Sequence, residues 1–434
     1  MQELYEKVIQ AEGVCYDSRK ALPGQVFFAF KDQRDGNNFA ADALEKGCVY
    51  AVIDSKEMQV PGDDRYILVE DAYTALQGIA KLHRAKFDIP IIGITGSNGK
   101  TTTKELLSRV LAKKYQVLST HASYNSGIGL PIMVLSLRPE HEIAVLEMGA
   151  NHIGEIAEIC EIAQPTHGII TNISAAHIGE FGSLQNIIDT KKALFAWLRD
   201  HGGHAFVHAD DEVVMNLAHD IDQTTYSIAG DADCIVRPVG YTPFATIESG
   251  GREQSTHLFG AYNIINMAAA VTVGMSFGVS LTDALEATGS FVPDNNRSQV
   301  EQYDAGTLII DCYNANPVSM GVALEAFVDW PTDAKDKVVI IGGMRELGHE
   351  SRHAHAAVID TVREYMFSAV YFVGPEFIEV REDDFGVYFN TVADMISWID
   401  SGQFNVSGKT IFLKSSLGTN LLALLPLVRT MISR

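Results

Sequence analysis

The sequence predicts a three-domain α/β protein with largely parallel sheets, and three observations lead to this prediction. The chain has 434 residues, enough for roughly two to four domains. Short apolar stretches rich in β-branched residues alternate with helical patterns over most of the length, as parallel sheets with crossover helices require. Proline-containing breaks at 87–90 and 292–296 interrupt this alternation. We therefore expect domains at residues 1–88, 89–294 and 295–434.

Each expected strand is a short, mainly apolar run beside a helical pattern. The short length and the enrichment in valine and isoleucine favour buried strands over helices. The clearest runs are residues 66–69, 91–95, 144–147, 168–171, 307–311, 338–342, 369–373 and 410–413.

The composition argues against several classes of protein. A formal net charge of -22 is unsuited to a surface for nucleic acid or anionic membranes, because both partners require positive potential. A phosphate ligand stays open, since backbone N–H groups and a few cations can hold it locally. Solubility alone is sufficient to explain the acidic net charge.

The cysteines and the apolar stretches indicate a cytoplasmic protein. The five cysteines form no C-x-x-C pair, which fits reduced thiols better than disulfides or a zinc site. The N-terminal segment 1–10 is charged and lacks the apolar core of a signal peptide. The apolar stretch 421–428 is too short to span a bilayer and contains Pro426, so we expect no membrane insertion.

The clearest local signal is a glycine-rich loop between an expected strand and an expected helix. The β-branched run 91–95 leads into the loop, and an amphipathic pattern follows Lys100 and Thr101. Glycines let backbone N–H groups close on phosphate oxygens, Lys100 reaches the β- and γ-phosphates, and the Thr101 hydroxyl ligates Mg²⁺. The expected phosphate-binding residues are Gly96, Ser97, Asn98, Gly99, Lys100, Thr101 and Thr102.

The loop departs from the general P-loop pattern, which places a glycine where this chain has Ile94. By itself it leaves a kinase, an NTPase, a ligase and a GTP switch open. Glu147 ends another expected strand, so its carboxylate is a candidate second protein ligand to Mg²⁺. The alternative is a surface acid at a strand end.

Further motifs, in a fixed order along the chain, narrow the function. They are the segments 17–29, 146–156, 171–183, 260–266, 311–317 and 346–351. Together with the shortened loop, they closely resemble the Mur ligase superfamily, and within it the ligases that join D-alanyl-D-alanine to a UDP-N-acetylmuramoyl-tripeptide. The resemblance covers nearly the whole chain.

The resemblance implies an architecture and a reaction. The architecture is an N-terminal UDP-substrate-binding domain, a central ATP-binding P-loop domain and a Rossmann-like C-terminal domain. The reaction uses ATP and two Mg²⁺ ions to convert the tripeptide carboxylate into an acyl phosphate, which the amine of D-alanyl-D-alanine attacks. It releases ADP and phosphate in the last cytoplasmic step of peptidoglycan precursor synthesis, and we expect a monomeric enzyme.

The same resemblance implies which residues hold the metal. They are Thr101, Glu147, His177 and Lys191. Lys191 is expected to be carbamylated, which turns a cation into a carboxylate-like ligand. From residue type alone, Lys191 is a solvated helical lysine and His177 a structural histidine. The residues expected to be catalytic are Lys100, Lys191, His177 and Asn125, the last beside the substrate and phosphate.

The nucleoside contacts also follow from the resemblance. Asn263 is expected to face adenine, and Arg297 and Asp311 to approach the ribose and phosphates from the C-terminal domain. As bare residues, asparagine and aspartate are also common turn and capping groups. The remaining expected contacts are Asn314 and Asn316 in the cleft, and Ser18 and Arg19 toward the UDP end of the substrate.

Several positions depart from the family pattern. Gly343 stands where aspartate is common, Asn296 replaces a glycine, and Cys312 replaces a serine. Residues 414–417 stand in place of a Lys-Gly-Ser-Arg stretch, so Leu417 replaces the arginine. The missing arginine weakens or relocates recognition of the dipeptide carboxylate. The alternatives are another amide ligase of the superfamily, such as a folylpolyglutamate synthase, and a non-catalytic nucleotide-binding protein. The sequence leaves open whether the third residue of the tripeptide is diaminopimelate or lysine.

Overall fold

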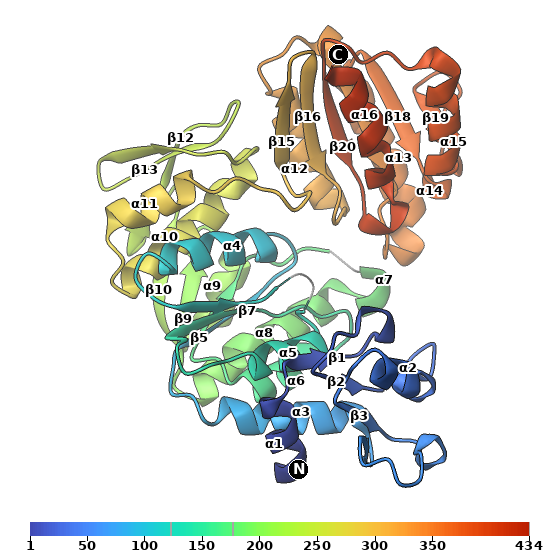
Figure 1. Cartoon of the computed structure of the whole chain (residues 1–434). Helices are drawn as coiled ribbons and strands as arrows, with labels where there is room; N and C mark the ends of the chain where they lie inside the picture. The colour runs from blue at the N-terminus through green and yellow to red at the C-terminus, as the bar shows by residue number, and fades with distance from the viewer. Residues whose placement is uncertain (122–123, 176–177, 434) are drawn as a thin grey trace.

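Four β-sheets organise the part of the chain that the computed structural model describes, which is residues 1–121, 124–175 and 178–433. Each sheet is built from one continuous stretch of sequence. Figure 1 shows the N-terminal sheet (blue) and the C-terminal sheet (orange to red) at the two ends of the view, both joined to the central part. The prediction of an α/β chain with largely parallel sheets is confirmed.

The N-terminal sheet has four parallel strands in the order β1-β2-β3-β4. Its core is continuous with the central core, because Leu76 of helix α3 belongs to the same apolar cluster as Leu146. The buried guanidinium of Arg84 donates hydrogen bonds to the carbonyl oxygens of Ala163 (2.8 Å) and Gln164 (3.1 Å). The elements are α1 (Gln2–Gln10), β1 (Gly13–Cys15), β2 (Gln25–Phe28), α2 (Ala40–Glu45), β3 (Tyr50–Ile53), β4 (Tyr66–Leu68) and α3 (Ala72–Arg84).

The central sheet has seven strands in the order β11-β10-β9-β8-β5-β7-β6, and every neighbouring pair is parallel. Both faces are buried: Ile92 and Ile94 belong to the apolar cluster of Leu107 on α4, and Ile91 to that of Leu194 on α8. The strands are β5 (Ile91–Thr95), β6 (Val117–Ser119), β7 (Ile143–Glu147), β8 (His167–Ile170), β9 (His204–His208), β10 (Asp222–Ser227) and β11 (Cys234–Ile235). The helices are α4 (Lys100–Leu111), α5 (Gly129–Leu135), α6 (Glu155–Ala163), α7 (Ile178–Phe181), α8 (Leu184–Asp200), α9 (Glu212–Ala218), α10 (Ile264–Ser276) and α11 (Leu281–Gly289).

A small antiparallel sheet follows the central one and was not among the predicted strands. Its strands are β12 (Arg237–Gly240), β13 (Thr246–Ser249) and β14 (Arg252–Ser255), in that order. In Figure 1 it lies beside α10 and α11, away from the N-terminal sheet.

The C-terminal sheet has the order β15-β16-β20-β17-β18-β19. Only the pair β15–β16, at one edge, is antiparallel among its described strand pairs. The strands are β15 (Gln299–Tyr303), β16 (Gly306–Asp311), β17 (Lys337–Gly342), β18 (Ala369–Val373), β19 (Val387–Phe389) and β20 (Lys409–Lys414). The helices are α12 (Pro317–Val328), the short 3-10 turn η6 (Gly348–Glu350), α13 (Ser351–Glu364), α14 (Pro375–Ile378), α15 (Val392–Trp398) and α16 (Leu425–Ile432).

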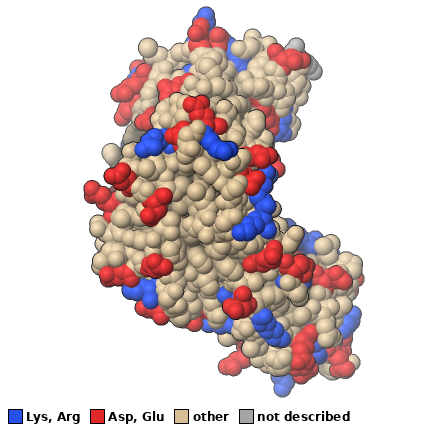
Figure 2. All heavy atoms as spheres, turned by 90° about the vertical axis from the view of Figure 1, so that its left-hand side faces the viewer, with Lys and Arg blue, Asp and Glu red and all other residues tan. Residues whose placement is uncertain are grey.

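Three further features are the predicted domain limits, the surface charge and the length of the apolar helices. The domain limits at 88/89 and 294/295 stay predictions, and each falls between two sheets. Figure 2 shows one face of the molecule, on which acidic and basic side chains are interspersed rather than gathered into a basic patch. None of the helices in the described ranges combines the length and apolar character needed to cross a bilayer.

Candidate active site

The phosphate loop lies between β5 and α4, at the carboxyl edge of the central sheet. Gly96 and Gly99 have φ angles of 144° and 84°, in the region that favours glycine. A Cβ on Gly96 would lie 1.9 Å from Thr171 Oγ1, and one on Gly99 would lie 2.5 Å from Asn266 Oδ1. Backbone conformation and close neighbours therefore both require glycine at these two positions.

The segment that follows β8 holds the loop in shape. Asn98 donates its backbone N–H to Asn172 Oδ1 at 3.1 Å, and Ser97 donates its hydroxyl to the Ser174 carbonyl oxygen at 2.9 Å. Thr171 Oγ1 donates to the Asn98 carbonyl oxygen at 2.6 Å. Asn172 was not among the predicted site residues. Its signal was available, because Asn172 lies in the family segment 171–183.

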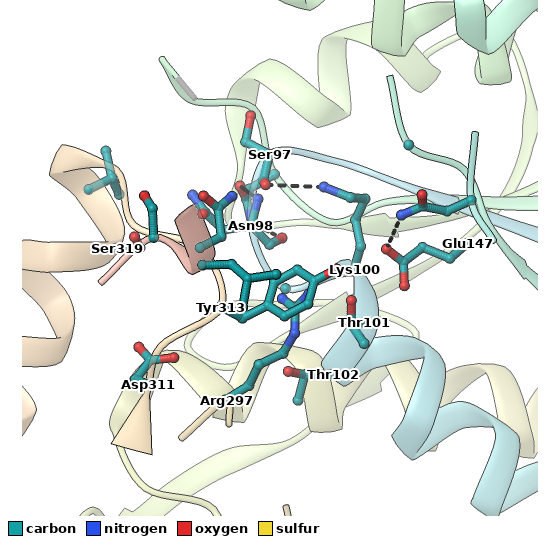
Figure 3. A pocket seen from close by; sticks show the side chains of 18 of the residues that line it. Ser97, Asn98, Lys100, Thr101, Thr102, Glu147, Arg297, Asp311, Tyr313 and Ser319 are labelled. Carbon is teal, nitrogen blue, oxygen red and sulfur yellow. Dashed lines mark hydrogen bonds between the residues drawn. The ribbon is translucent and has the colours of Figure 1, made fainter. Parts of the chain in front are cut away.

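Lys100 is the first residue of α4, and its side chain turns back over the loop. Its Nζ donates to the carbonyl oxygens of Gly96 (2.7 Å) and Ser97 (3.2 Å), as Figure 3 shows in part. Desolvation lowers the pKa of Lys100; Glu147 opposes this shift and Arg297 adds to it. The ammonium is thus held where phosphate oxygens would replace the two carbonyls.

Glu147 ends β7 and is buried. Its Oε1 accepts a hydrogen bond from Asn125 Nδ2 at 2.8 Å, the contact drawn at the right of Figure 3. Its Oε2 is buried without a hydrogen-bond partner among the described residues. A buried carboxylate oxygen is costly unless a cation or donor meets it, so this atom fits a hard metal ion such as Mg²⁺.

Lys191 lies on α8 and is buried. Burial, followed by the nearby charge of Lys100, lowers its pKa to about 7. The prediction of a helix here is confirmed, whereas the alternative of a solvated lysine is wrong. His177 lies outside the described residues.

The C-terminal sheet contributes a second group of charges. Asp311 ends β16, and its Oδ2 lies 2.5 Å from the Nζ of buried Lys414 at the end of β20. The guanidinium carbon of Arg297 lies 3.6 Å from the ring centroid of Tyr313, and the two stack at the centre of Figure 3. Lys414 and Tyr313 were not among the predicted site residues, although Tyr313 lies in the family segment 311–317.

Asparagines lie on both the central and the C-terminal side of the site. Asn263 is buried before α10, where its Nδ2 donates to the Phe259 carbonyl oxygen at 2.8 Å. Asn316 caps α12 through Ser319 and also donates from Nδ2 to Asn98 Oδ1 at 2.8 Å. The loop and α12 are therefore in direct contact.

These groups surround one cavity of about 570 Å³. Predicted site residues in its lining are Ser97, Asn98, Gly99, Lys100, Thr101, Thr102, Asn125, Glu147, Asn263, Arg297, Asp311 and Asn314. Gly96 and Asn316 contact the lining. Lys191 is near enough to Lys100 of the lining for the charge of Lys100 to lower its pKa. Ser18 and Arg19 are not part of it: Ser18 is buried near β1, and Arg19 is exposed and pairs with Asp17.

In the described ranges, no three His, Cys, Asp or Glu side chains converge as a metal cluster. A Mg²⁺ ion here would therefore be held by Glu147 and the Thr101 hydroxyl together with oxygens of the nucleotide itself. This donor set suits a metal that arrives with phosphates.

Known proteins are similar to this chain in sequence and in fold. The model of the Mur ligase middle domain matches residues 94–274, and the model "Mur ligase, glutamate ligase domain" matches residues 296–412. The chain is 33% identical over 349 residues to the UDP-N-acetylmuramoyl-tripeptide–D-alanyl-D-alanine ligase of Bacillus subtilis, covering 79% of this chain and 76% of that protein. It is 30% identical over 392 residues to the Escherichia coli protein of the same name, covering 86% and 84%.

The solved structures agree. A crystal structure of MurF from Acinetobacter baumannii superposes with a TM-score of 0.85 at 27% identity, over 99% of this chain and 98% of that one. The chain therefore belongs to the Mur ligase family of ATP-dependent ligases, and within it to the UDP-N-acetylmuramoyl-tripeptide–D-alanyl-D-alanine ligases.

Proposed function

We propose that this enzyme joins D-alanyl-D-alanine to UDP-N-acetylmuramoyl-tripeptide at the expense of ATP, through an acyl phosphate. The observation that carries the proposal is the cavity itself. It joins a phosphate loop and the Glu147 oxygen that has no partner in the described part of the chain to charged groups of the C-terminal sheet. Phosphoryl transfer followed by acyl transfer needs this combination: phosphate binding, charge neutralisation and room for two further substrates.

In the first step, a carboxylate oxygen of the tripeptide attacks the γ-phosphorus, and the bond from that phosphorus to the ADP oxygen breaks. Lys100 leaves the carbonyl oxygens of Gly96 and Ser97 and binds the β- and γ-phosphates, where its charge opposes the charge that develops. In the second step, the dipeptide amine attacks the acyl carbon, phosphate leaves with the C–O bond electrons, and the amine gives up a proton. Asn125 donates a hydrogen bond to Glu147 and lines the same cavity, which supports its proposed place beside the reacting groups.

Two Mg²⁺ ions belong to the proposal. Thr101 and Glu147 would hold the first, and His177 and carbamylated Lys191 the second. When bound, Mg²⁺ neutralises phosphate charge. A pKa of about 7 keeps a large fraction of Lys191 neutral at physiological pH, and only the neutral amine can attack CO₂ and lose a proton to form a carbamate.

The other assignments extend the reaction to the whole chain. Residues 1–88 would bind the UDP end of the substrate, with Ser18 and Arg19 toward it, 89–294 would bind ATP, and 295–434 would close over the nucleotide. We also propose a cytoplasmic monomer.

Asn263 toward adenine, and Arg297 and Asp311 toward the ribose and phosphates, complete the ATP site. Their shared place in one lining supports this assignment. Asn314 lines the same cavity, and Asn316 lies against the loop.

The test is phosphate release from ATP by the purified protein with Mg²⁺, the UDP-linked tripeptide and D-alanyl-D-alanine, omitting one substrate at a time. We expect release to require both substrates and a UDP-linked pentapeptide to appear by mass spectrometry. Running the lysine and diaminopimelate tripeptides side by side would identify the preferred third residue. Release without the dipeptide, or with glutamate in its place, would point to a different amide ligase. Nucleotide binding without release would point to a non-catalytic protein.

Two variants sharpen this test. Glu147→Gln keeps the side-chain shape but removes the charge that faces the metal, so we expect a loss of at least about 100-fold in turnover. Glu286→Gln makes the same change at an exposed position on α11 and should leave turnover unchanged.

A further inference from the structure

Four basic side chains line the described part of the cavity, and three of them already serve the nucleotide side. Lys100 lies on the phosphate loop, Arg297 stacks on Tyr313, and Lys414 pairs with Asp311. The fourth cation, Arg345, has no place in the ATP site proposed above.

Arg345 follows β17 and lies at the rim of the cavity. Its backbone N–H donates to Ser416 Oγ at 3.0 Å, which fixes the two segments side by side. A Cβ on Gly418 would lie 3.7 Å from Arg345 Cγ and 3.8 Å from its Nε, so the guanidinium stem passes directly over this glycine. The Arg345 side chain is 43% exposed. Leu417, which also lines the cavity, carries no charge.

Glu376 holds this guanidinium in one direction. Its Oε1 lies 2.7 Å from Arg345 Nη1. The carboxylate occupies space left by two glycines: a Cβ on Gly343 would lie 2.6 Å from Glu376 Oε2, and one on Gly374 would lie 2.7 Å from it. Because a guanidinium carries five N–H donors, the contact with Glu376 leaves others for a second anion.

The proposed reaction requires such an anion to be bound. The incoming dipeptide brings an amine that must reach the acyl carbon near the phosphate loop and a carboxylate at its other end. An extended dipeptide spans at most about 7 Å, so the carboxylate must meet a cation on the wall of the same cavity. A planar guanidinium held by a second carboxylate is suited to this, since it can donate two parallel hydrogen bonds.

We propose that Arg345 binds the carboxylate of the incoming dipeptide and that Glu376 is a positioning residue for it. The inference rests on the proposed function and deepens it, because it identifies the group that selects a free C-terminal carboxylate in the nucleophile. It also accounts for Gly343, since a larger side chain there would displace Glu376.

The test compares the wild-type protein, Arg345→Met and Arg345→Lys in the phosphate-release assay, with Arg352→Met as a matched control on the exposed side of α13. For Arg345→Met we expect the KM for D-alanyl-D-alanine to rise about 10- to 100-fold while the KM for ATP is unchanged. Arg345→Lys keeps the charge but lacks the planar pair of N–H donors. Its KM for D-alanyl-D-alanine should therefore lie between the values of the wild type and Arg345→Met. Arg352→Met should match the wild type.

A second substrate separates carboxylate binding from general damage. The wild type should use D-alanyl-D-alanine amide with a KM raised by about the same factor as in Arg345→Met, and Arg345→Met should no longer distinguish the amide from the acid. If Arg345→Met still prefers the acid as strongly as the wild type, or if both Arg345 variants keep the wild-type KM, the inference is wrong. If the wild type itself releases no phosphate with the dipeptide, the proposed function fails instead.

Discussion

At the scale of single residues, some of the polar atoms that are buried without a partner among the described residues belong to Glu147 of the cavity lining or to residues next to the lining or the phosphate loop. Thr95 Oγ1, Glu147 Oε2, Glu376 Oε2 and Ser415 Oγ are four of them. Buried polar groups in native proteins are normally paired, so unpaired ones cost stability and are kept where a ligand completes them. Glu147 and Glu376 each have one paired and one unpaired oxygen, which is the state expected of groups held ready for a cation or for a positioning role.

His167, on β8, predicts how stability depends on pH. Its ring lies 4.9 Å from that of Phe277, and burial, with a smaller contribution from His204, lowers its pKa to about 4. The folded pKa lies below the unfolded value of about 6.5, so the unfolded chain binds a proton first. Stability is therefore fully present above pH 6.5 and is lost as the pH falls toward 4. This group alone should remove about 2 kcal/mol between pH 7 and pH 5.

Urea unfolding at pH 7 and pH 5 checks this value. The variant His167→Gln should lose less stability than the wild type over that interval, by about 2 kcal/mol. His353→Gln, at an exposed position on α13, should keep the wild-type dependence. An unchanged dependence in His167→Gln would mean that other histidines carry the effect.

At the scale of elements, the apolar runs that were predicted as strands are strands, whereas the polar strands of the antiparallel sheet were not predicted. The predicted runs 91–95 and 369–373 coincide with β5 and β18, because buried parallel strands are continuously apolar. The antiparallel strands β12 to β14 carry charged and polar residues on a half-exposed sheet, so no apolar run marked them.

The site residues also fall into two groups, those that local sequence predicts and those that depend on long-range packing. The loop residues follow one another in sequence and could be predicted together. The pair of Asp311 and Lys414, and the approach of Arg345 to Gly418, depend on which strands become neighbours in the C-terminal sheet. Strand order is set by long-range packing, which local patterns do not encode.

Helix α12 combines a structural and a functional contact at its first turn. Asn316 accepts a hydrogen bond from the Ser319 N–H at 2.9 Å as the helix cap, and its Nδ2 reaches Asn98 of the phosphate loop. Serine caps as well as asparagine but is too short to reach the loop. We expect Asn316→Ser to keep the free energy of unfolding and to raise the KM for ATP about fivefold, the effect of one lost hydrogen bond. Asn316→Ala should show the same KM and also lose about 1 kcal/mol.

Thr391 provides the control. It forms the same kind of capping box at α15, with Asp394, and does not line the cavity. Thr391→Ala should lose about 1 kcal/mol of stability with an unchanged KM for ATP. If Asn316→Ser and the wild type bind ATP equally well, the contact between Asn316 and Asn98 has no role in the nucleotide site.

At the scale of the whole molecule, the two ends of the chain are attached to the centre in different ways. The N-terminal sheet shares a continuous apolar core with the central sheet. The C-terminal sheet takes in Phe259, whose ring lies 6.0 Å from that of Phe412, and at the cavity Asn316 and Asn98 form a polar contact. Because polar contacts with the phosphate loop can be exchanged for contacts with a ligand, we expect the C-terminal part to move relative to the central part when ATP binds.

The contact of α7 with the C-terminal part tests this arrangement. Gly179 donates its backbone N–H to the Glu346 carbonyl oxygen at 3.0 Å, and a Cβ on Gly179 would lie 2.8 Å from that oxygen and 2.8 Å from Gly348 N. Both neighbours are backbone atoms, so Gly179→Ala must push the C-terminal part away from α7. We expect kcat to fall at least about 10-fold at saturating substrates, because groups from both parts must converge on ATP.

Small-angle scattering should show a larger radius of gyration for Gly179→Ala, while the melting temperature should change little, because no core contact is removed. Gly321→Ala is the matched control: it lies in α12, and a Cβ there would meet no atom within 4 Å. It should keep kcat and add roughly 0.5–1 kcal/mol of stability, as an alanine inside a helix does. A Gly179→Ala enzyme with wild-type kcat and wild-type dimensions would show that α7 does not limit how the C-terminal part approaches the phosphate loop.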